Sequence, residues 1–263
     1  MPDEFKKVLS TLFKSHPWHG VDVGPNAPEV VKAYIEIVPA DSVKLELDKA
    51  TGHLHVDRPQ LFSSRCPTLY GFIPKTYCDK RVGKFASLKT KRKGIEGDHD
   101  PLDICVLTEN DFAHGDLFIT ARVIGGLRMI DKGEADDKII AVLENDVSYG
   151  QMRDIKDVPK AVVERLCHYF LSYKRHPDEK AANSMVQIEA VYGRSEAQEI
   201  IRLSMSDYDE AFGTEEQRLA DLRDLLLERV KPQDKPVGDK KPGKKPVDGK
   251  SGDKKPHGKK HGK

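Results

Sequence analysis

Hydrophobic and polar residues alternate with a period of two along much of the chain between residues 30 and 147. Over residues 43–48, Val43, Leu45 and Leu47 point to one face and the charged residues between them point to the other. This is the pattern of a strand with one buried face. Similar patterns predict strands over residues 33–38, 53–57, 102–107, 117–124 and 138–143. Short strands separated by Gly, Asp and Pro turns favour a small barrel or a strongly curved sheet.

A helical period replaces this alternation towards both ends of the chain. It predicts a short amphipathic helix over residues 3–14, within an N-terminal segment of residues 1–20, and a second helix over residues 158–174. Two further helices are expected to open at possible capping boxes, Ser195-x-x-Gln198 and Thr214-x-x-Gln217, the last running to about residue 230. The chain is therefore expected to be mainly β with flanking α-helices, an α+β fold.

Charge divides the chain in two, although 44 Lys and Arg nearly balance 43 Asp and Glu. The tail of residues 231–263 has 12 Lys and 4 Asp, a net charge of +8, which leaves residues 1–230 with 32 basic and 39 acidic residues, at −7. We expect the Lys/Pro/Gly-rich tail to be disordered, because it cannot bury enough apolar surface to offset the entropy cost of ordering. An acidic body argues against a nucleic-acid-binding core, while the tail could bind polyanions weakly.

Several classes of protein are excluded by what the sequence lacks. No apolar run reaches the roughly 18–20 residues of a membrane span, and the N-terminus does not resemble a signal peptide. The four cysteines are scattered, which favours reduced thiols and a cytoplasmic protein. Neither a P-loop nor a G-x-S-x-G nucleophile motif is present.

The densest chemistry lies in the segment G-D-H-D-P-L-D, where Asp98 and Asp100 share a face of the extended chain and Asp103 begins the next strand. A second acidic group occupies a Gly-containing loop between two predicted strands: Asp131, Asp136 and Asp137. Two carboxylates about 4 Å apart repel by about 4 kcal/mol at an effective dielectric of 20, so converging carboxylates take up protons or bind a cation. Ligands that are all oxygen favour Mg²⁺, then Mn²⁺ or Ca²⁺. A solvated acidic surface is the alternative.

Basic and phenolic side chains accompany these carboxylates. Lys44 and Glu46 share one strand face, near Glu36 if the strands pair, and other cationic or phenolic groups end or begin predicted elements: Arg58, Lys138, Tyr173 and Lys174. Carboxylates facing Lys, Arg and Tyr donors suit a metal-complexed oligophosphate as substrate.

The segment G-D-H-D-P-L-D resembles the D-x-D-P-x-D signature of the family I soluble inorganic pyrophosphatases. Between residues 33 and 174 the chain also carries, in register, IEI, V-K-x-E-x-D-K, V-D-R, L-Y-G, the D-x₄-D-x-K loop and Y-K. HPWHG, PADSVK, KTYC and ADDKIIAVLE resemble the Chlamydia-type bacterial members in particular. The resemblance implies a five-stranded OB-like closed barrel with C-terminal helices, within a pyrophosphatase domain of residues 21–230. It also implies Mg²⁺-dependent hydrolysis of pyrophosphate to two orthophosphates, Mn²⁺ or Zn²⁺ being possible substitutes, and a homo-oligomer.

The resemblance further implies a role for each matching residue. Asp98, Asp103 and Asp136 would bind the first metal ion, and Asp103 would bridge to the second. Asp131 and Asp136 would bind the ions that arrive with substrate, and Glu36 would act on one of these through water. Asp100 would deprotonate the attacking water, Tyr70 would hydrogen-bond near the reacting groups, and Glu46 would support the basic residues. The phosphate oxygens would be held by Lys44, Arg58, Lys138, Tyr173 and Lys174, of which Arg58 would also be catalytic.

Three features depart from the family pattern. Cys66 replaces a frequent active-site tyrosine and is expected to be a packed thiol, and Lys132 stands where an acidic residue is frequent. Residues 78–96 form an insertion with seven Lys or Arg, for which a mobile surface loop is the plain expectation. The alternative hypothesis places this insertion over the mouth of the site, where it would attract anionic substrate.

Two other functions remain open from the residues. A two-metal hydrolase of other phosphate anhydrides or esters would use the same carboxylates. A nucleotide substrate would also need an aromatic base-stacking pocket, yet the aromatic residues, 7% of the chain, are spread along it. A non-catalytic polyanion-binding scaffold is the third reading, disfavoured because every expected ligand and the expected base are acidic.

Overall fold

The structure, a computed structural model, describes residues 14–60, 63–174, 178 and 185–230. Nearly all of the helix predicted over residues 3–14 and the whole tail of residues 231–263 lie outside these ranges. The chain divides into two compact units, up to Arg218 and from Leu219 onward, and the first contains all the strands. Among the described helices, each is too short or too polar to serve as a membrane span.

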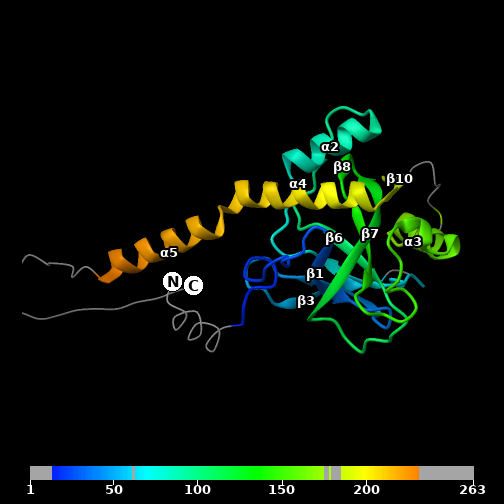
Figure 1. Cartoon of the computed structure of the whole chain (residues 1–263), viewed down its shortest axis with the longest axis horizontal. Helices are drawn as coiled ribbons and strands as arrows, with labels where there is room; N and C mark the ends of the chain where they lie inside the picture. The colour runs from blue at the N-terminus through cyan, green and yellow to red at the C-terminus, as the bar shows by residue number, and fades with distance from the viewer. Residues whose placement is uncertain (1–13, 61–62, 175–177, 179–184, 231–263) are drawn as a thin grey trace, which may run out of the picture. The chain divides into compact units, whose positions relative to one another are not determined.

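Five strands close into a ring (Figure 1). Around it, β1 (Val30–Ile37) pairs with β4 (Leu69–Phe72), β4 with β6 (Asp103–Leu107), β6 with β9 (Lys138–Leu143), β9 with β7 (Leu117–Asp131), and β7 with β1. All pairs are antiparallel except β6–β9. Closure satisfies the backbone groups that an open sheet would leave at its edges. The predicted five-stranded closed barrel is confirmed.

Strand β7 is longer than the predicted segment 117–124, because its second half pairs with β10 (Val186–Gly193), which the sequence analysis did not predict. Gly125 and Gly126 permit this close approach. A Cβ atom on Gly125 would lie 2.5 Å from the carbonyl oxygen of Tyr192, and one on Gly126 would lie 2.4 Å from the Tyr192 hydroxyl. Two short strands, β8 (Glu134–Ala135) and β5 (Glu96–Gly97), extend the sheet beyond β7.

A two-stranded hairpin and the helices complete the fold. Their bounds are β2 (Val43–Leu47), β3 (Leu54–Pro59), α2 (Lys80–Thr90), η1 (Ile155–Asp157), α3 (Lys160–Ser172), α4 (Arg194–Phe212) and α5 (Glu215–Val230). The capping box predicted at Thr214 is confirmed: its N–H donates to Gln217 Oε1 at 2.8 Å, and Gln217 N–H donates to Thr214 Oγ1 at 3.4 Å. The capping box predicted at Ser195 is wrong, because α4 already begins at Arg194 and continues directly from β10.

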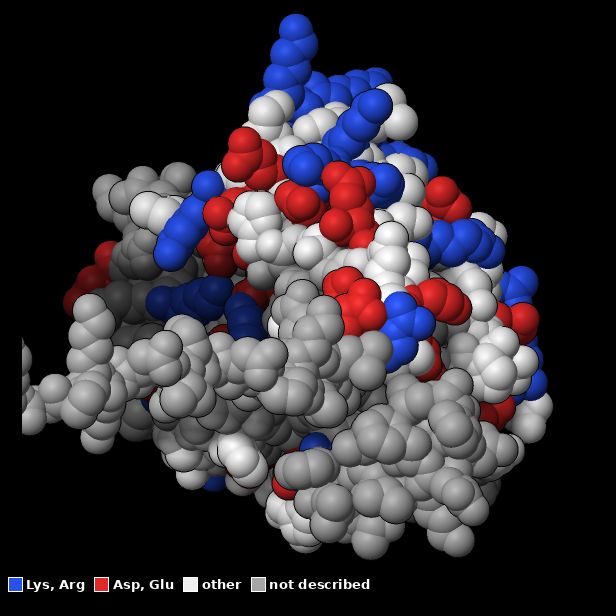
Figure 2. Space-filling view, turned by 90° about the vertical axis from the view of Figure 1, so that its left-hand side faces the viewer, with Lys and Arg blue, Asp and Glu red and all other residues white. Residues whose placement is uncertain are grey.

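Residues 78–96, expected to be a mobile surface loop, contain helix α2 instead. Val82 and Ala86 are buried in the main hydrophobic core, and α2 packs on α4. Lys and Arg side chains crowd the top of the face in Figure 2, where α2 lies. Several of them pair with acids of α4, as in Arg81–Asp207 at 3.0 Å. The expectation of a loop was wrong because frequent charges conceal a short apolar stripe along this helix.

Candidate active site

A cavity of about 230 Å³ opens beside the ring. Side chains reach it from β1, the β2–β3 hairpin, β4, the segment 98–103, the β7–β9 connection and the end of α3. Its lining includes every predicted site residue except Arg58: Glu36, Lys44, Glu46, Tyr70, Asp98, Asp100, Asp103, Asp131, Asp136, Lys138, Tyr173 and Lys174. The fold therefore brings together residues that lie more than 130 positions apart along the chain.

Strand register explains the centre of the site. The parallel strands β6 and β9 both begin at the cavity, and their first pair is Asp103 opposite Lys138. On the other side of β6, Tyr70 of β4 pairs with Cys105. The Tyr70 hydroxyl donates a hydrogen bond of 2.6 Å to Asp103 Oδ2. Asp103 is thus held from both neighbouring strands.

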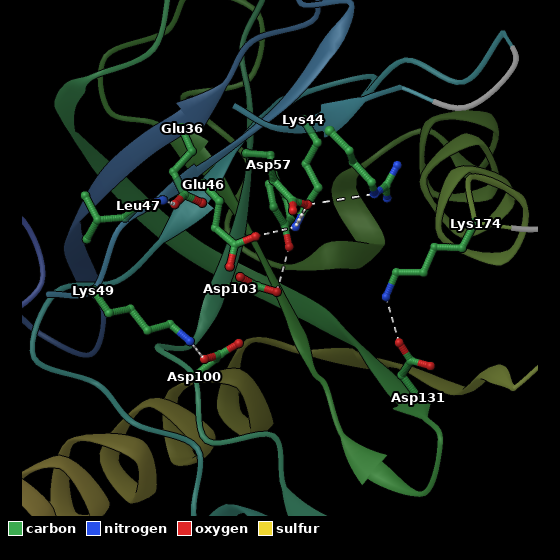
Figure 3. Close-up of polar contacts among 12 residues, drawn as sticks. Glu36, Lys44, Glu46, Leu47, Lys49, Asp57, Asp100, Asp103, Asp131 and Lys174 are labelled. Carbon is green, nitrogen blue, oxygen red and sulfur yellow. Dashed lines mark hydrogen bonds and ion pairs between the residues drawn. The ribbon is translucent and has the colours of Figure 1, made fainter. Parts of the chain in front are cut away.

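Lysine ammonium groups neutralise the converging carboxylates (Figure 3). Lys138 Nζ pairs with both Asp103 and Asp136, and Lys174 Nζ lies 2.7 Å from Asp131 Oδ2. Because these ammonium groups stand among the acids, no three carboxylates within the described ranges already surround a single metal position.

Burial disfavours the ionised forms of Asp98, Asp136 and Glu36, and of these three only Asp136 has an ion-pair partner within the described ranges. Burial raises the pKa of Asp98 to about 9, helped by the charge of Asp136, and burial likewise raises the pKa of Asp136. Burial also raises the pKa of Glu36 to about 8, against a 2.7 Å hydrogen bond from Leu47 N–H to Glu36 Oε1. Carboxyl groups that hold protons for want of a counter-charge suit a hard divalent cation.

The cationic side of the site is built by the β2–β3 hairpin. Lys44 Nζ lies 2.6 Å from Glu46 Oε2 and 3.0 Å from Asp57 Oδ2. Burial alone would lower the pKa of Lys44, but its hydrogen bonds with these two acids raise that pKa to about 12, so the ammonium group stays charged. The expectation that Glu46 supports a basic residue thus has a geometric basis.

Arg58 lies beside the cavity without lining it. Its guanidinium carbon lies 5.9 Å from the centroid of the Tyr173 ring, and Tyr173 does line the cavity. Its Nη1 atom is buried and has no hydrogen-bond partner within the described ranges. A buried donor without an acceptor suits an anion such as phosphate.

Sequence reasoning assigned no role to several residues that the structure places at the site, among them Lys49, Asp57 and Trp18. Lys49 lines the cavity and pairs with Asp100, Asp57 pairs with Lys44, and Trp18 forms part of the cavity wall. Lys49 belongs to the V-K-x-E-x-D-K motif, which could have identified it. The pairing of Asp57 depends on register in the hairpin, which the pattern does not reveal.

Two of the three departures from the family pattern, Cys66 and Lys132, lie outside the cavity lining. Cys66 is buried, its Sγ lies 4.0 Å from Thr68 Oγ1, and burial raises the pKa of its thiol to about 11. Lys132 is exposed in the β7–β8 turn with φ of 52°. Cys66 is thus a packed, protonated thiol.

The family model described as inorganic pyrophosphatase matches residues 33–209, more than half of the chain. The chain belongs to the inorganic pyrophosphatase family. It is 52% identical over 199 residues to the inorganic pyrophosphatase of Chlamydia muridarum, covering 75% of this chain and 95% of that protein. It is 38% identical over 181 residues to the soluble inorganic pyrophosphatase of Oryza sativa subsp. indica, covering 67% of this chain and 76% of that one.

Solved structures agree with this assignment. The inorganic pyrophosphatase of Thermus thermophilus superposes with a TM-score of 0.61 at 30% sequence identity, covering 74% of this chain and 99% of that chain. The OB-like fold and the resemblance to the Chlamydia-type family I members are confirmed. This pyrophosphatase is an enzyme that hydrolyses pyrophosphate, and family I pyrophosphatases depend on metal ions.

Proposed function

We propose that this chain hydrolyses inorganic pyrophosphate to two orthophosphates with several Mg²⁺ ions bound in the cavity of the candidate active site. The observation that carries this proposal is the convergence of Asp and Glu side chains from separate segments on one cavity that is also lined by Lys and Tyr side chains. Mn²⁺ or Zn²⁺ could substitute, since carboxylate sites select divalent ions mainly by geometry and supply.

Five acidic residues would hold the cations. Asp98, Asp103 and Asp136 would hold the first ion, with Asp103 also serving a second. Asp131 and Asp136 would hold the ions that accompany the substrate, and Glu36 would act through water. The raised pKa values of Asp98 and Glu36 support this assignment, because a cation supplies the missing counter-charge. The chemistry that bound Mg²⁺ supplies is a lowered pKa for water and neutralisation of phosphate charge.

Asp100 takes the proton from the attacking water. Its N–H donates a 3.1 Å hydrogen bond to Asp98 Oδ1, which ties the orientation of the base to that of the neighbouring ligand. Lys49 pairs with Asp100 and thereby holds its carboxylate at the cavity wall.

Basic and phenolic groups hold the two phosphates. A lysine whose carboxylate partner binds a cation has its N–H groups free for phosphate oxygens, which applies to Lys138 and Lys174. Lys44, Tyr173 and the unpartnered Nη1 of Arg58 complete the set. These donors stabilise charge on the departing phosphate. Tyr70 contributes by holding Asp103 in place.

A phosphate-release assay with a Mg²⁺ titration tests the proposal. Asp100→Asn should keep Mg²⁺ binding yet lose about 10²–10⁴-fold in kcat, the usual cost of removing a general base. Asp111→Asn, at an exposed position outside the cavity lining, is the matched control and should keep full activity. Wild-type kcat in Asp100→Asn would refute the base assignment, and faster phosphate release from ATP or a simple ester would favour a broader phosphohydrolase.

The proposal includes the setting in which the enzyme works. The four cysteines are free thiols, which supports a reducing, cytoplasmic location. A pyrophosphatase domain of residues 21–230, assembled as a homo-oligomer, is part of the same proposal. Analytical ultracentrifugation of the full chain tests the assembly.

A further inference from the structure

A cluster centred on the buried ion pair of Arg128 and Asp137 lies on the side of the 136–138 segment that faces away from the cavity. Its members come from α2, β7, the β8–β9 connection, β10 and α4: Phe85, Arg128, Asp137, Tyr192 and Glu196. The side chains of Arg128 and Asp137 are each only 2% exposed. Asp136 and Lys138 line the cavity, whereas none of the cluster does. The mechanism proposed above uses no member of this cluster.

Asp137 fills a gap in the hydrogen-bonded ladder of β7. That strand pairs with β8 through Ile130 opposite Ala135, and with β9 through Leu127 opposite Lys138, but Asp136 and Asp137 belong to neither strand. Asp136 N–H still donates to the Met129 carbonyl at 3.0 Å. Met129 N–H donates at 3.2 Å to the side-chain Oδ1 of Asp137. A carboxylate thus supplies the acceptor that the backbone lacks, directly beside Asp136.

Arg128 fixes that carboxylate from the other side. Its Nε and Nη2 donate to Asp137 Oδ2 at 3.4 and 3.3 Å, and the Tyr192 hydroxyl donates to the same oxygen at 3.3 Å. Arg128 Nη2 also lies 3.1 Å from Glu196 Oε1 on the first turn of α4. The guanidinium carbon lies 5.2 Å from the ring centroids of both Phe85 and Tyr192. A planar group held this way has little freedom to move.

We propose that Asp137 and Arg128 are positioning residues for pyrophosphate hydrolysis, fixing the orientation of Asp136 and Lys138 on the opposite side of the same segment. The inference rests on the proposed function, in which Asp136 binds a metal ion and Lys138 binds phosphate. Partners that orient metal ligands typically contribute about 10–100-fold to metal affinity or activity. A displacement of about 1 Å in a site can cost about 10²-fold in rate.

The test measures metal affinity and kinetics separately from stability. Asp137→Asn, Arg128→Met and the double variant are compared as full chains by Mn²⁺ binding in electron paramagnetic resonance, by kcat and KM for pyrophosphate, and by Tm. Asp146→Asn is the matched control: Asp146 is also buried and accepts from Thr108 Oγ1 at 2.6 Å and Tyr149 N–H at 2.9 Å. It lies beyond the ends of β6 and β9 that are remote from the cavity.

We expect Asp137→Asn to lower both the affinity for Mn²⁺ and kcat, each by about tenfold or more. Asp146→Asn should lower Tm while keeping both quantities within about twofold of wild type. The fold loss in kcat of the double variant should be smaller than the product of the two single losses, because both substitutions break the same Arg128–Asp137 contact. Asn is nearly isosteric with Asp, so if Arg128→Met does not fold, the Mn²⁺ affinity and kcat of Asp137→Asn alone test the positioning role.

Two outcomes separate this inference from the proposed function. If Asp137→Asn changes only Tm, as Asp146→Asn does, while Asp136→Asn weakens Mn²⁺ binding, the positioning role is wrong and the ligand assignment stands. If Asp136→Asn leaves Mn²⁺ affinity unchanged, the ligand assignment is wrong. The positioning role is then decided by kcat alone. It stands if kcat of Asp137→Asn is about tenfold below that of Asp146→Asn, and it is overturned if the two values are similar.

Discussion

Replacing Lys138 by methionine keeps most of the side-chain volume and removes a buried ammonium group. The Lys138 side chain is 2% exposed, and Nζ pairs with Asp103 and Asp136. Burial alone would lower the pKa of Lys138, but the two carboxylates raise it well above its ordinary value, so the group is charged. Lys138→Met therefore leaves two acids beside Asp98 without their counter-charge.

The stability loss follows from this geometry. Removing one partner of a buried ion pair costs about 3–5 kcal/mol. Asp103 and Asp136 keep side-chain exposures of 22% and 14%, so we expect the lower end, about 3 kcal/mol, in the metal-free protein near neutral pH. A divalent cation held by the same carboxylates replaces the missing charge. Mg²⁺ stabilises both proteins, but in the wild type it must displace Lys138 from these carboxylates, so the variant should bind it more tightly. A Kd about 100-fold lower in the variant would add about 2.7 kcal/mol more to its folded state at saturation and would conceal most of the defect.

Urea unfolding with EDTA and with saturating Mg²⁺ measures this difference. Lys160→Met is the control: its i,i+4 pair with Glu164 at 3.1 Å is exposed, and its loss should cost only about 0.3–0.5 kcal/mol with or without Mg²⁺. Activity of Lys138→Met should stay about 10²-fold low even with Mg²⁺, because a charged hydrogen bond to phosphate is gone. An equal stability loss with and without Mg²⁺ would refute the idea that the lysine and the cation neutralise the same carboxylates.

Three other predictions follow from the same site. The unfolding free energy of the metal-free protein should fall as pH rises from about 5 to 9, since Glu36 and Asp98 have folded pKa values of about 8 and 9 and hold protons that the unfolded chain releases. Urea unfolding in EDTA across this range checks it, and Asp98→Asn should flatten the decline. Tyr70→Phe removes the 2.6 Å hydrogen bond to Asp103 and should weaken Mn²⁺ binding about tenfold; a change below twofold contradicts the orienting role. The third prediction concerns exposed lysines of the α2 region without an ion-pair partner within the described ranges: Lys84, Lys91 and Lys93. Changing all three to glutamine should lower kcat/KM at low salt only, and an unchanged salt dependence would end the hypothesis that this region attracts substrate.

The hydrophobic pattern located most strands of the ring, because each of these has apolar residues on one face or throughout, which can be recognised over five or six residues. It could not show that β6 and β9 run parallel with Asp103 opposite Lys138, since that register depends on strands more than 30 positions apart. The convergence of the acidic residues was therefore anticipated from their types and from the family motif. Their pairing with particular lysines was not.

Elements stabilised mainly by tertiary contacts were the ones missed. In α2 the apolar stripe is short and interrupted by basic residues whose partners lie on α4, as with Arg81 and Asp207. β10 forms against the second half of β7, where Gly125 and Gly126 leave room for it. Both partners, α4 for α2 and the second half of β7 for β10, lie far along the chain from the segment they stabilise, so a local hydrophobic pattern does not include them.

The lysine–carboxylate pairs explain how such an acidic cavity can fold before any ion is present. Asp103 and Asp136 share Lys138, and Asp131 pairs with Lys174, so three of the carboxylates in the cavity meet an ammonium group supplied by the chain itself. These lysines come from β9 and the end of α3, which the ring and its packed helix already hold in place. In the proposed function, a cation bound by the carboxylates would leave these ammonium groups free for phosphate oxygens. Metal binding and substrate binding would then be coupled through the same charges, which is why Lys138→Met should lower the activity with Mg²⁺ while its stability defect is largest without the ion.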